Sequence, residues 1–244
     1  MRDIPADWLE PPDLATATAV QRELAGRVVE ADDFGPVRRI GGADISHNPR
    51  SGDDIVHAAL VALSAADLTP RAEAGATLPA RFPYVPGFLG FREVPALVAA
   101  WQDLAEPPDL VFVDGHGRSH PRGLGIACQL GVVLDVPTIG VAKSILVGRP
   151  EGELGPEPGD RVPLVWRGRT VAMALRTKRR SNPLFISTGH RIALETAVDW
   201  VLRCLRGYRL PEPTRQAHLA ANRLRLGADA PPSDATLPDA PQLL

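Results

Sequence analysis

Short apolar runs separated by glycine, proline and aspartate recur along the chain, and such runs are typical of strands inside a sheet. The clearest run covers residues 110–113 and ends at Asp114, directly before a glycine. Four apolar residues in succession indicate a strand that is buried on both faces, as in the centre of a parallel sheet. Asp114 would then lie at the carboxyl end of a central strand, where open α/β sheets bind ligands. An aspartate that only caps a strand–helix turn is the competing interpretation.

The rest of the chain divides into further strands and helices. Small or β-branched apolar runs with turn signals at their ends predict strands, and apolar positions spaced three or four residues apart predict helices. The first three strands follow one another through short connections, which indicates an antiparallel meander. The predicted strands are 37–46, 55–64, 67–77, 110–113, 138–141, 162–166 and 170–175, and the predicted helices are 11–30, 92–104, 124–134, 191–206 and 215–223.

Three carboxylates hold related places in this order of elements. Asp44 lies in the first predicted strand, Glu93 at the start of the helix after the meander, and Asp114 at the end of the fourth strand. Three antiparallel strands, a helix, a strand, a helix, a strand and then helices is the ribonuclease H-like order, in which carboxylates at these places converge. We therefore expect an α/β fold of the ribonuclease H-like type, a mixed sheet flanked by helices.

This set of side chains indicates a class of chemistry. Carboxylates from separate elements suit a two-metal phosphodiester site, because Mg²⁺ takes oxygen ligands and keeps waters for a substrate phosphate. Lys143 follows the short strand 138–141 and would lie at the same edge of the sheet. A lysine whose stem covers apolar surface while its charge stays in water is the alternative interpretation.

A stiff loop is predicted over residues 81–87. Pro83 and Pro86 fix φ and lack a backbone donor, so this stretch is neither a central strand nor a helix. Tyr84 lies between the two prolines. It is either a tyrosine packed on the loop surface or one held towards solvent, where the prolines reduce the entropy lost on binding.

Length and charge refine this interpretation. A chain of 244 residues with 44% hydrophobic residues fits one large domain, and we expect it over residues 1–226, followed by a disordered tail rich in Ala, Pro and Asp over 227–244. Residues 161–223 hold 13 lysines and arginines against three acidic residues, a net +10, which leaves −12 for the remainder of a chain of net charge −2. A surface that faces a polyanion is favoured over a scattered solvated one.

Compartment and membrane association follow from what the sequence contains. Two cysteines make neither a disulfide framework nor a zinc site. The first residues do not form the apolar segment of a signal peptide, and the longest apolar run, 58–63, is far too short to cross a bilayer. We expect a cytoplasmic protein with no membrane partner.

Several motifs together resemble endonuclease V, the deoxyinosine-directed nuclease family. The Pro-Tyr-Val-Pro and Asp-Gly-His-Gly segments in combination are specific, whereas either alone is weak. The resemblance spans roughly residues 36–220, and the 148–159 loop and the tail lie outside it. The matching stretches are 42–44, 83–89, 91–93, 108–121, 136–143, 182–190 and 207–215.

The resemblance implies hydrolysis that depends on Mg²⁺, for which Mn²⁺ can substitute. It implies cleavage of the second phosphodiester bond 3′ to a deaminated base such as inosine, leaving a 3′-hydroxyl and a 5′-phosphate, in DNA repair. Asp44, Glu93 and Asp114 match metal-site carboxylates and Lys143 a catalytic lysine, while His218 matches a histidine near the metal site in some members. The loop with Pro83, Tyr84 and Pro86 matches a wedge that fills the helix where the base left, and the positions around that base match Gly87, Leu89, Gly115, His120, Gly125 and Ile126.

Two other functions remain open at this point. One is a ribonuclease H-like nuclease with another structural target, against which the wedge and the glycines argue. The other is an inosine-binding module without catalysis, against which the three carboxylates argue. The expected partner is DNA that contains deaminated bases, with RNA as an undecided alternative because 2′-hydroxyl contacts leave no legible signature. We expect a monomer.

Overall fold

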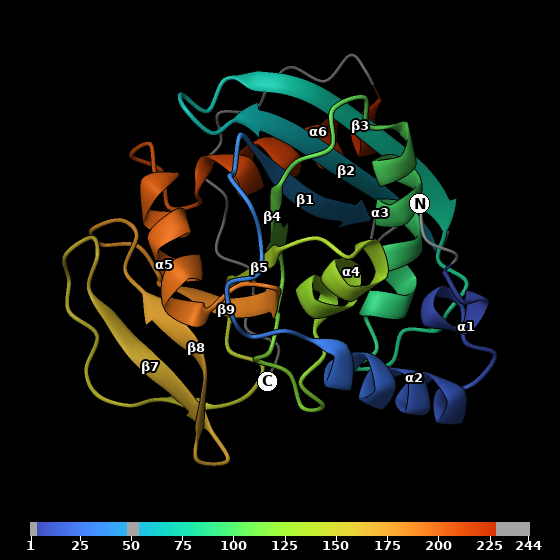
Figure 1. The fold of residues 1–244 in the computed structure, drawn as a ribbon, viewed down its shortest axis with the longest axis horizontal. Coiled ribbons are helices and arrows are strands. Elements are labelled where there is room, and N and C mark those ends of the chain that lie inside the picture. Colours follow the sequence, from blue (N-terminus) through green and yellow to red (C-terminus); the bar gives the residue numbers. More distant parts are fainter. Residues whose placement is uncertain (1–3, 48–53, 228–244) are drawn as a thin grey trace.

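A mixed sheet forms the centre of the molecule (Figure 1). The computed structural model describes residues 4–47 and 54–227, and within these ranges the nine strands lie in the order β3-β2-β1-β4-β5-β9-β8-β7-β6. β1, β4 and β5 run parallel to one another, and the other neighbours are antiparallel. The strands are β1 Arg39–His47, β2 Ile55–Ser64, β3 Pro70–Pro79, β4 Leu110–Asp114, β5 Thr138–Ala142, β6 Arg149–Pro150, β7 Arg161–Trp166, β8 Arg169–Leu175 and β9 Leu184–His190.

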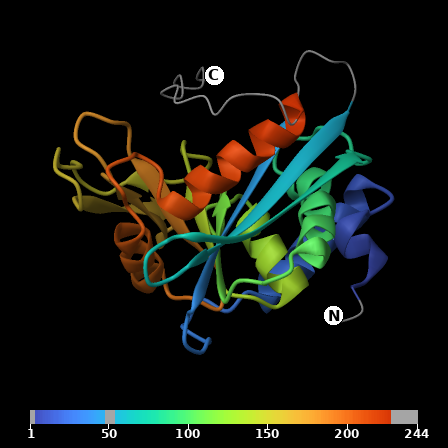
Figure 2. The same ribbon diagram turned by 90° about the horizontal axis from the view of Figure 1, so that it is seen from above.

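Helices cover both faces of this sheet. α3 and α4 pack on one face through a core of small and branched side chains from β1, β2 and β4. α5 and α6 pack on the other face, and α6 crosses β1 and β2 there (Figure 2). The helices are α1 Ala6–Leu9, α2 Leu14–Arg27, α3 Gly90–Asp103, α4 Ile126–Leu134, α5 Leu194–Arg203 and α6 Glu212–Leu226. Each described helix is too short or too polar to traverse a bilayer.

The unbroken apolar run of β4 is explained by this two-sided cover. Val111 and Val113 pack against the α3 and α4 side, whereas Leu110 and Phe112 pack against the α5 side. All four are buried. The predicted central strand is therefore confirmed, and it delivers Asp114 to the carboxyl edge of the sheet.

A close crossing of α6 over β1 depends on Gly42. A Cβ atom at this position would overlap the backbone carbonyl of Pro213, in the first turn of α6. Because glycine has no Cβ, the helix can lie directly on the strand. This contact places the face of α6 that carries His218 above the strand that carries Asp44.

The mixed α/β class and the meander are confirmed, but one strand was not predicted and the bounds of two helices are wrong. Residues 184–190 form β9, a strand between β5 and β8, whereas the sequence reading predicted no strand there. α5 is shorter than the predicted 191–206, because residues 191–193 form a bend after β9 and the helix ends at Arg203. α6 starts at Glu212 rather than at residue 215, since Pro211 caps it and a proline is tolerated in a first helical turn.

Smaller differences occur elsewhere. α2 is shorter than the predicted 11–30, and Asp13 caps it by accepting a hydrogen bond from the Thr16 amide at 2.7 Å. No hydrophobic pattern in the sequence predicted the short elements α1 and β6. The expected tail over 227–244 lies, apart from Gly227, outside the described residues, and the single domain over 1–226 stays a prediction.

Candidate active site

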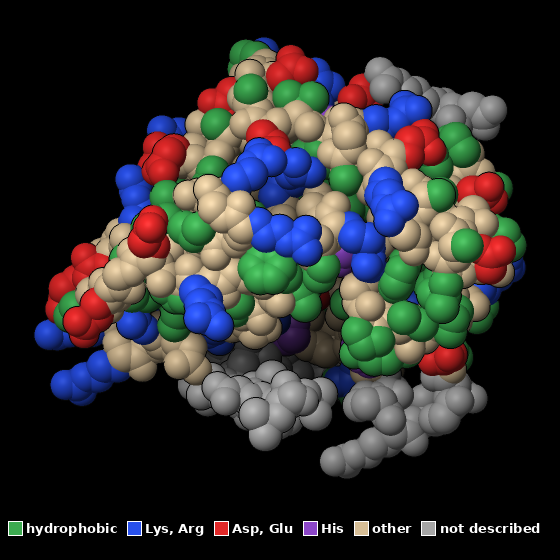
Figure 3. All heavy atoms as spheres, turned by 90° about the horizontal axis from the view of Figure 1, so that it is seen from below, with side chains coloured by type: hydrophobic (Ala, Val, Ile, Leu, Met, Phe, Trp, Pro, Cys, Tyr) green, Lys and Arg blue, Asp and Glu red, His purple; other side chains and the backbone are tan. Residues whose placement is uncertain are grey.

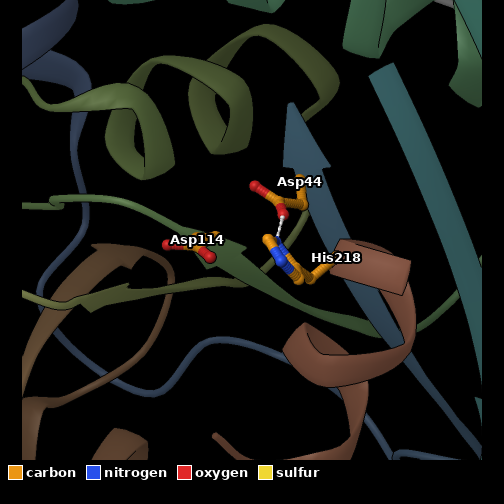
Figure 4. Close-up of side chains that lie close together, drawn as sticks. All are labelled: Asp44, Asp114 and His218. Carbon is orange, nitrogen blue, oxygen red and sulfur yellow. Dashed lines mark hydrogen bonds and ion pairs between the residues drawn. The ribbon is translucent and has the colours of Figure 1, made fainter. Parts of the chain in front are cut away.

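Two aspartates and a histidine meet at the carboxyl edge of β1 and β4 (Figure 4). The parallel register pairs Ala43 with Val113, so that Asp44 and Asp114 follow side by side on neighbouring strands. His218 reaches them from α6. One potential ligand atom from each of the three side chains lies within 4.8 Å of the other two, an arrangement that could hold a metal ion.

The imidazole of His218 is oriented by contacts at both ring nitrogens. Nδ1 lies 2.7 Å from Oδ2 of Asp44, and Nε2 lies 2.9 Å from Nδ2 of Asn222. The Asn222 Oδ1 atom accepts a hydrogen bond from Ser46 at 3.0 Å, so the amide nitrogen is the atom left to donate to the histidine. Nε2 is therefore the acceptor, and Nδ1 carries the proton that Asp44 accepts.

Lys143 lies next to Asp114. It follows β5, whose register pairs Val141 with Asp114. The ammonium nitrogen is 2.5 Å from Oδ2 of Asp114, and the lysine side chain is one-third exposed. Burial alone would lower the pKa of Lys143, but the carboxylates of Asp114 and Asp44 raise it above its usual value, so the side chain is cationic. The structure thus favours the strand-edge interpretation over the surface lysine.

The carboxylates crowd one another. Burial, and then repulsion by Asp44, raise the pKa of Asp114 to about 6, although Lys143 and His218 act in the opposite direction. Glu93 lies in the first turn of α3 and is buried. Burial, followed by repulsion from Asp44 and Asp114, raises its pKa to about 8. Glu93 thus faces the other two acids, yet it is not part of the compact group formed by Asp44, Asp114 and His218.

The proline loop holds its tyrosine towards solvent. Tyr84 is 73% exposed, which rules out a ring packed on the loop surface. The loop is anchored at its start by Arg92, whose guanidinium donates to the Phe82 carbonyl oxygen at 2.7 Å and lies 5.9 Å from the Tyr84 ring centroid. Phe82, Phe88 and Phe91 pack together below it.

The positions expected around the base fall into two neighbourhoods. Gly115, with a φ of +150°, abuts the side chain of Ile126, the first residue of α4, and Gly125 caps that helix. Gly87 and His120 form the second neighbourhood, with 3.1 Å between the Gly87 carbonyl oxygen and Nε2 of the imidazole. Leu89 caps α3 beside the proline loop and is half-exposed, whereas Pro83 and Pro86 flank Tyr84 in the loop.

Sequence reasoning missed Asn222, which fixes the orientation of His218. The spacing of four residues on one helix was the available signal, because residues i and i+4 face the same side. It also missed the role of Arg92, which directly precedes Glu93 in sequence but whose side chain donates a hydrogen bond to the proline loop.

Part of the excess positive charge of residues 161–223 is neutralised by ion pairs with acidic residues elsewhere in the chain. Arg223 pairs with Glu73 at 2.7 Å and Arg191 with Asp33 at 3.1 Å, both acids from outside the segment. Basic side chains nevertheless gather on one face of the molecule, next to a hollow in which histidine side chains are visible (Figure 3). Fewer basic side chains are therefore available to face a polyanion than the net charge of +10 for this segment suggests.

A groove of about 460 Å³ lies away from these residues. Arg38, Ile40, Trp200 and Arg203 are among the residues that line it. It lies at the amino end of β1, whereas Asp44 lies towards the other end of that strand. The groove is therefore not part of the candidate active site.

Known proteins are similar to this chain in fold and in sequence. The family model of endonuclease V matches residues 22–219. The chain belongs to the endonuclease V family. It is 62% identical over 223 residues to an endonuclease V of Rhodospirillum centenum, covering 91% of this chain and 93% of that protein. The crystal structure of endonuclease V from Streptomyces avermitilis is 41% identical, with a TM-score of 0.84 over 93% of this chain and 98% of the other.

A further endonuclease V structure contains nucleic acid. The protein of Ciona intestinalis, crystallised with a 24mer DNA that contains an inosine followed by a ribo-adenosine, is 26% identical, with a TM-score of 0.74 over 86% of this chain and 96% of that one. The family consists of metal-dependent nucleases, so this chain is a hydrolase. Asp44, Asp114 and His218 form a possible metal site within it.

Proposed function

We propose that this chain hydrolyses the second phosphodiester bond on the 3′ side of inosine in DNA, leaving a 3′-hydroxyl and a 5′-phosphate, as a step in DNA repair. The observation that carries the proposal is the group of Asp44, Asp114, His218 and Lys143 at one edge of the sheet. It combines anionic ligands with a cation that can face a phosphate. The inosine-containing DNA bound by the Ciona protein supports the substrate class.

The acidic residues fit a divalent cation. Burial, followed by repulsion between the acids, raises the pKa of Glu93 to about 8 and that of Asp114 to about 6, so a fully ionised cluster is costly without a positive partner. Asp44 and Asp114 would hold the ion, with Glu93 facing them from α3. His218 belongs to the same group, but both of its ring nitrogens are engaged by Asp44 and Asn222, so it would orient the Asp44 carboxylate. Mg²⁺ is the ion that we propose, with Mn²⁺ as a substitute. When bound, it supplies a water of lowered pKa and stabilises negative charge on the leaving oxygen.

Lys143 has a separate role in the proposal. Its ammonium lies beside Asp114 and is one-third exposed, so a phosphate entering the site would meet it. There it would offset the charge that develops on the phosphate oxygens and orient the attacking water. An ammonium does this as a compact point charge.

Recognition is assigned to the loop and to the two neighbourhoods of small residues. The exposed ring of Tyr84, between Pro83 and Pro86, would stack in the space that the base leaves. Gly115 and Gly125 would let the main chain approach the extruded base closely, because glycine has no Cβ, and Gly87, Leu89 and Ile126 would line the space around it.

The deciding experiment is cleavage of one labelled oligonucleotide with and without Mg²⁺. The wild-type chain is expected to cut an inosine strand at the second bond 3′ to the lesion and to leave a matched adenine strand intact, and the Asp114→Asn variant is the catalytic control. Cutting that follows mismatches or junctions instead of inosine would indicate a ribonuclease H-like nuclease with another target. Binding to inosine without cutting would indicate a non-catalytic module. Parallel DNA and RNA substrates decide which nucleic acid is preferred.

We also propose a monomer that works in the cytoplasm. Cys128 and Cys204 are both buried free thiols, which fits a reducing compartment. Sedimentation at micromolar concentration tests the oligomeric state.

A further inference from the structure

The carbonyl oxygen of Gly87 accepts hydrogen bonds from three side chains. Gln21 donates from Nε2 at 2.8 Å, Arg122 from Nη2 at 2.6 Å, and Nε2 of His120 lies 3.1 Å away. Gly87 ends the proline loop in a left-handed conformation, with a φ of +80°. A carbonyl oxygen has two lone pairs, so three donors more than use its acceptor capacity and fix the position of this peptide from three sides.

The three donors are also held by one another. Arg122 donates from Nε to Oε1 of Gln21, and its backbone amide donates to Nδ1 of His120 at 3.3 Å. The guanidinium carbon lies 4.2 Å from the ring centroid of Phe88. Gln21 is buried on α2, although glutamine is seldom fully buried without such partners. We call these residues, Gln21, Gly87, His120 and Arg122, the Gly87 cluster.

The hydrogen bonds define the state of His120. Since Nδ1 accepts from the Arg122 amide, the proton lies on Nε2, which donates to Gly87. Burial, together with the positive charge of Arg122, lowers the pKa of His120 to about 4, so the ring is neutral at physiological pH. Both of its nitrogens are engaged within the cluster, so the imidazole has no free nitrogen for a substrate.

We infer that Gln21 and Arg122 are positioning residues, which act through Gly87 to hold the end of the Tyr84 loop against α2 and the segment before α4. The inference rests on the proposed function of these elements. Gln21 is 66 residues from Gly87 in sequence and Arg122 is 35 residues away, so the cluster ties α2, the loop and the segment before α4 together. The other end of the loop is fixed by Arg92 at Phe82.

Because none of these side chains contacts the carboxylates, loss of the cluster is expected to affect lesion binding more than the chemical step. Arg122→Ala is expected to weaken binding to an inosine duplex by about tenfold to a hundredfold, the range for losing a charged hydrogen-bond donor. Single-turnover cleavage at saturating enzyme is expected to stay within about threefold of wild type, since the reacting groups are untouched. Arg122→Lys keeps the positive charge but loses the planar guanidinium. Its affinity for the inosine duplex is expected to lie between those of the wild type and Arg122→Ala.

The test combines hydrogen exchange with lesion binding in the full chain. Amide exchange is measured by mass spectrometry on the peptides that contain residues 82–89 and on those of β4, for wild type, Gln21→Ala, Arg122→Ala and Arg122→Lys. Arg22→Ala is the matched control, because Arg22 is an exposed neighbour on α2 whose charge acts on Arg122. Both alanine variants in the cluster are expected to speed exchange in 82–89 alone, and the control to leave it unchanged.

Each result decides one part of the inference. Unchanged exchange in 82–89, or faster exchange across β4 as well, would overturn the local positioning role. Faster exchange in 82–89 with unchanged lesion affinity would overturn the link to recognition, and equal losses of affinity in Arg22→Ala and Arg122→Ala would assign the effect to charge. If the wild-type chain fails to distinguish inosine from adenine, the proposed function fails, whereas the exchange data still decide whether the cluster holds the loop.

Discussion

Lys143 and Asp114 form an ion pair of 2.5 Å at the adjoining ends of β5 and β4. The pair gives one carboxylate of the crowded cluster a cationic partner from the chain itself. Glu93 has a different environment, because burial and two neighbouring acids dominate it. The two acids therefore differ in how readily they ionise, and this difference can be tested.

Asp114→Asn is expected to lower cleavage by more than the roughly 10- to 100-fold that follows loss of an outer partner of a metal ligand. The amide is nearly isosteric, so no cavity forms, and folding and nucleic-acid binding should be retained. Single-turnover cleavage in Mg²⁺, with circular dichroism as the folding control, measures this. Near-normal cleavage by the variant would contradict a ligand role for Asp114.

The metal-free protein is expected to lose thermal stability as the pH rises from about 4 to 8. Burial in the folded state raises the pKa of Glu93 from 4.5 to about 8 and the pKa of Asp114 from 3.8 to about 6. In this pH range the folded state therefore binds more protons than the unfolded state. The resulting stabilisation is fully present below the unfolded-state pKa values and is lost as the pH rises through the folded-state pKa values. Thermal unfolding in EDTA across this range tests it. Glu93→Gln should flatten the curve above pH 6, and a Tm that does not depend on pH in wild type would contradict the argument.

Asn222→Ala is expected to raise the Mg²⁺ concentration needed for half-maximal cleavage by about 10- to 100-fold. Without the donor at Nε2, the His218 ring can adopt the other tautomer and no longer presents Nδ1–H to Asp44. A metal titration of the cleavage rate measures the shift. Because Asn222 acts through His218, the double alanine variant should be no worse than His218→Ala alone, and additive losses would show an independent role.

Tyr84→Ala is expected to weaken binding to an inosine duplex by about 1–3 kcal/mol, the range for one base–aromatic stack. The chemical step should change little, because the ring is exposed to solvent and lies beside Arg92 rather than against the acids. Equilibrium binding in Ca²⁺ and single-turnover cleavage in Mg²⁺ separate the two effects. Tyr84→Phe is the matched control and should bind nearly as wild type. Normal binding with slow hydrolysis in the alanine variant would show that the wedge assignment is wrong.

Inosine is expected to be cut faster than adenine even in single strands. Hypoxanthine offers an acceptor at O6 and a donor at N1, and adenine reverses both, so fixed backbone groups that fit one leave the other unpaired. Single-turnover rates for the two bases opposite the same mismatched partner, and again in single strands, provide the test. Equal rates in single strands, where there is no helix to distort, would rule out a base-reading pocket.

The sequence predicted those parts of the site that local pattern determines. The apolar run that ends at Asp114 and the order of elements around Asp44 and Glu93 were sufficient to bring the acids together. β9 was not predicted, because the polar residues Ser187 and Thr188 interrupt the apolar pattern that is expected of a strand. Ser187 is fully buried because its hydroxyl accepts a hydrogen bond from the Gly117 amide at 2.8 Å, a partner 70 residues away.

The same limit applies to the residues that orient the site. Gln21 resembles any glutamine on a helix until the fold brings Gly87 to it. Asn222 could have been inferred from its spacing to His218, but only once His218 was known to need a fixed orientation. Such partners are defined by tertiary contacts, which local pattern does not encode.

Gly42 has a consequence for anyone who wishes to re-engineer this protein. The residue carries no functional group, yet the close approach of α6 to β1 depends on its missing methyl group. Even alanine there would separate the helix from the strand and with it His218 from Asp44. Mutational libraries should therefore show position 42 as intolerant as the acids themselves, and a screen for activity alone would mistake this spacer for a participant in the chemistry.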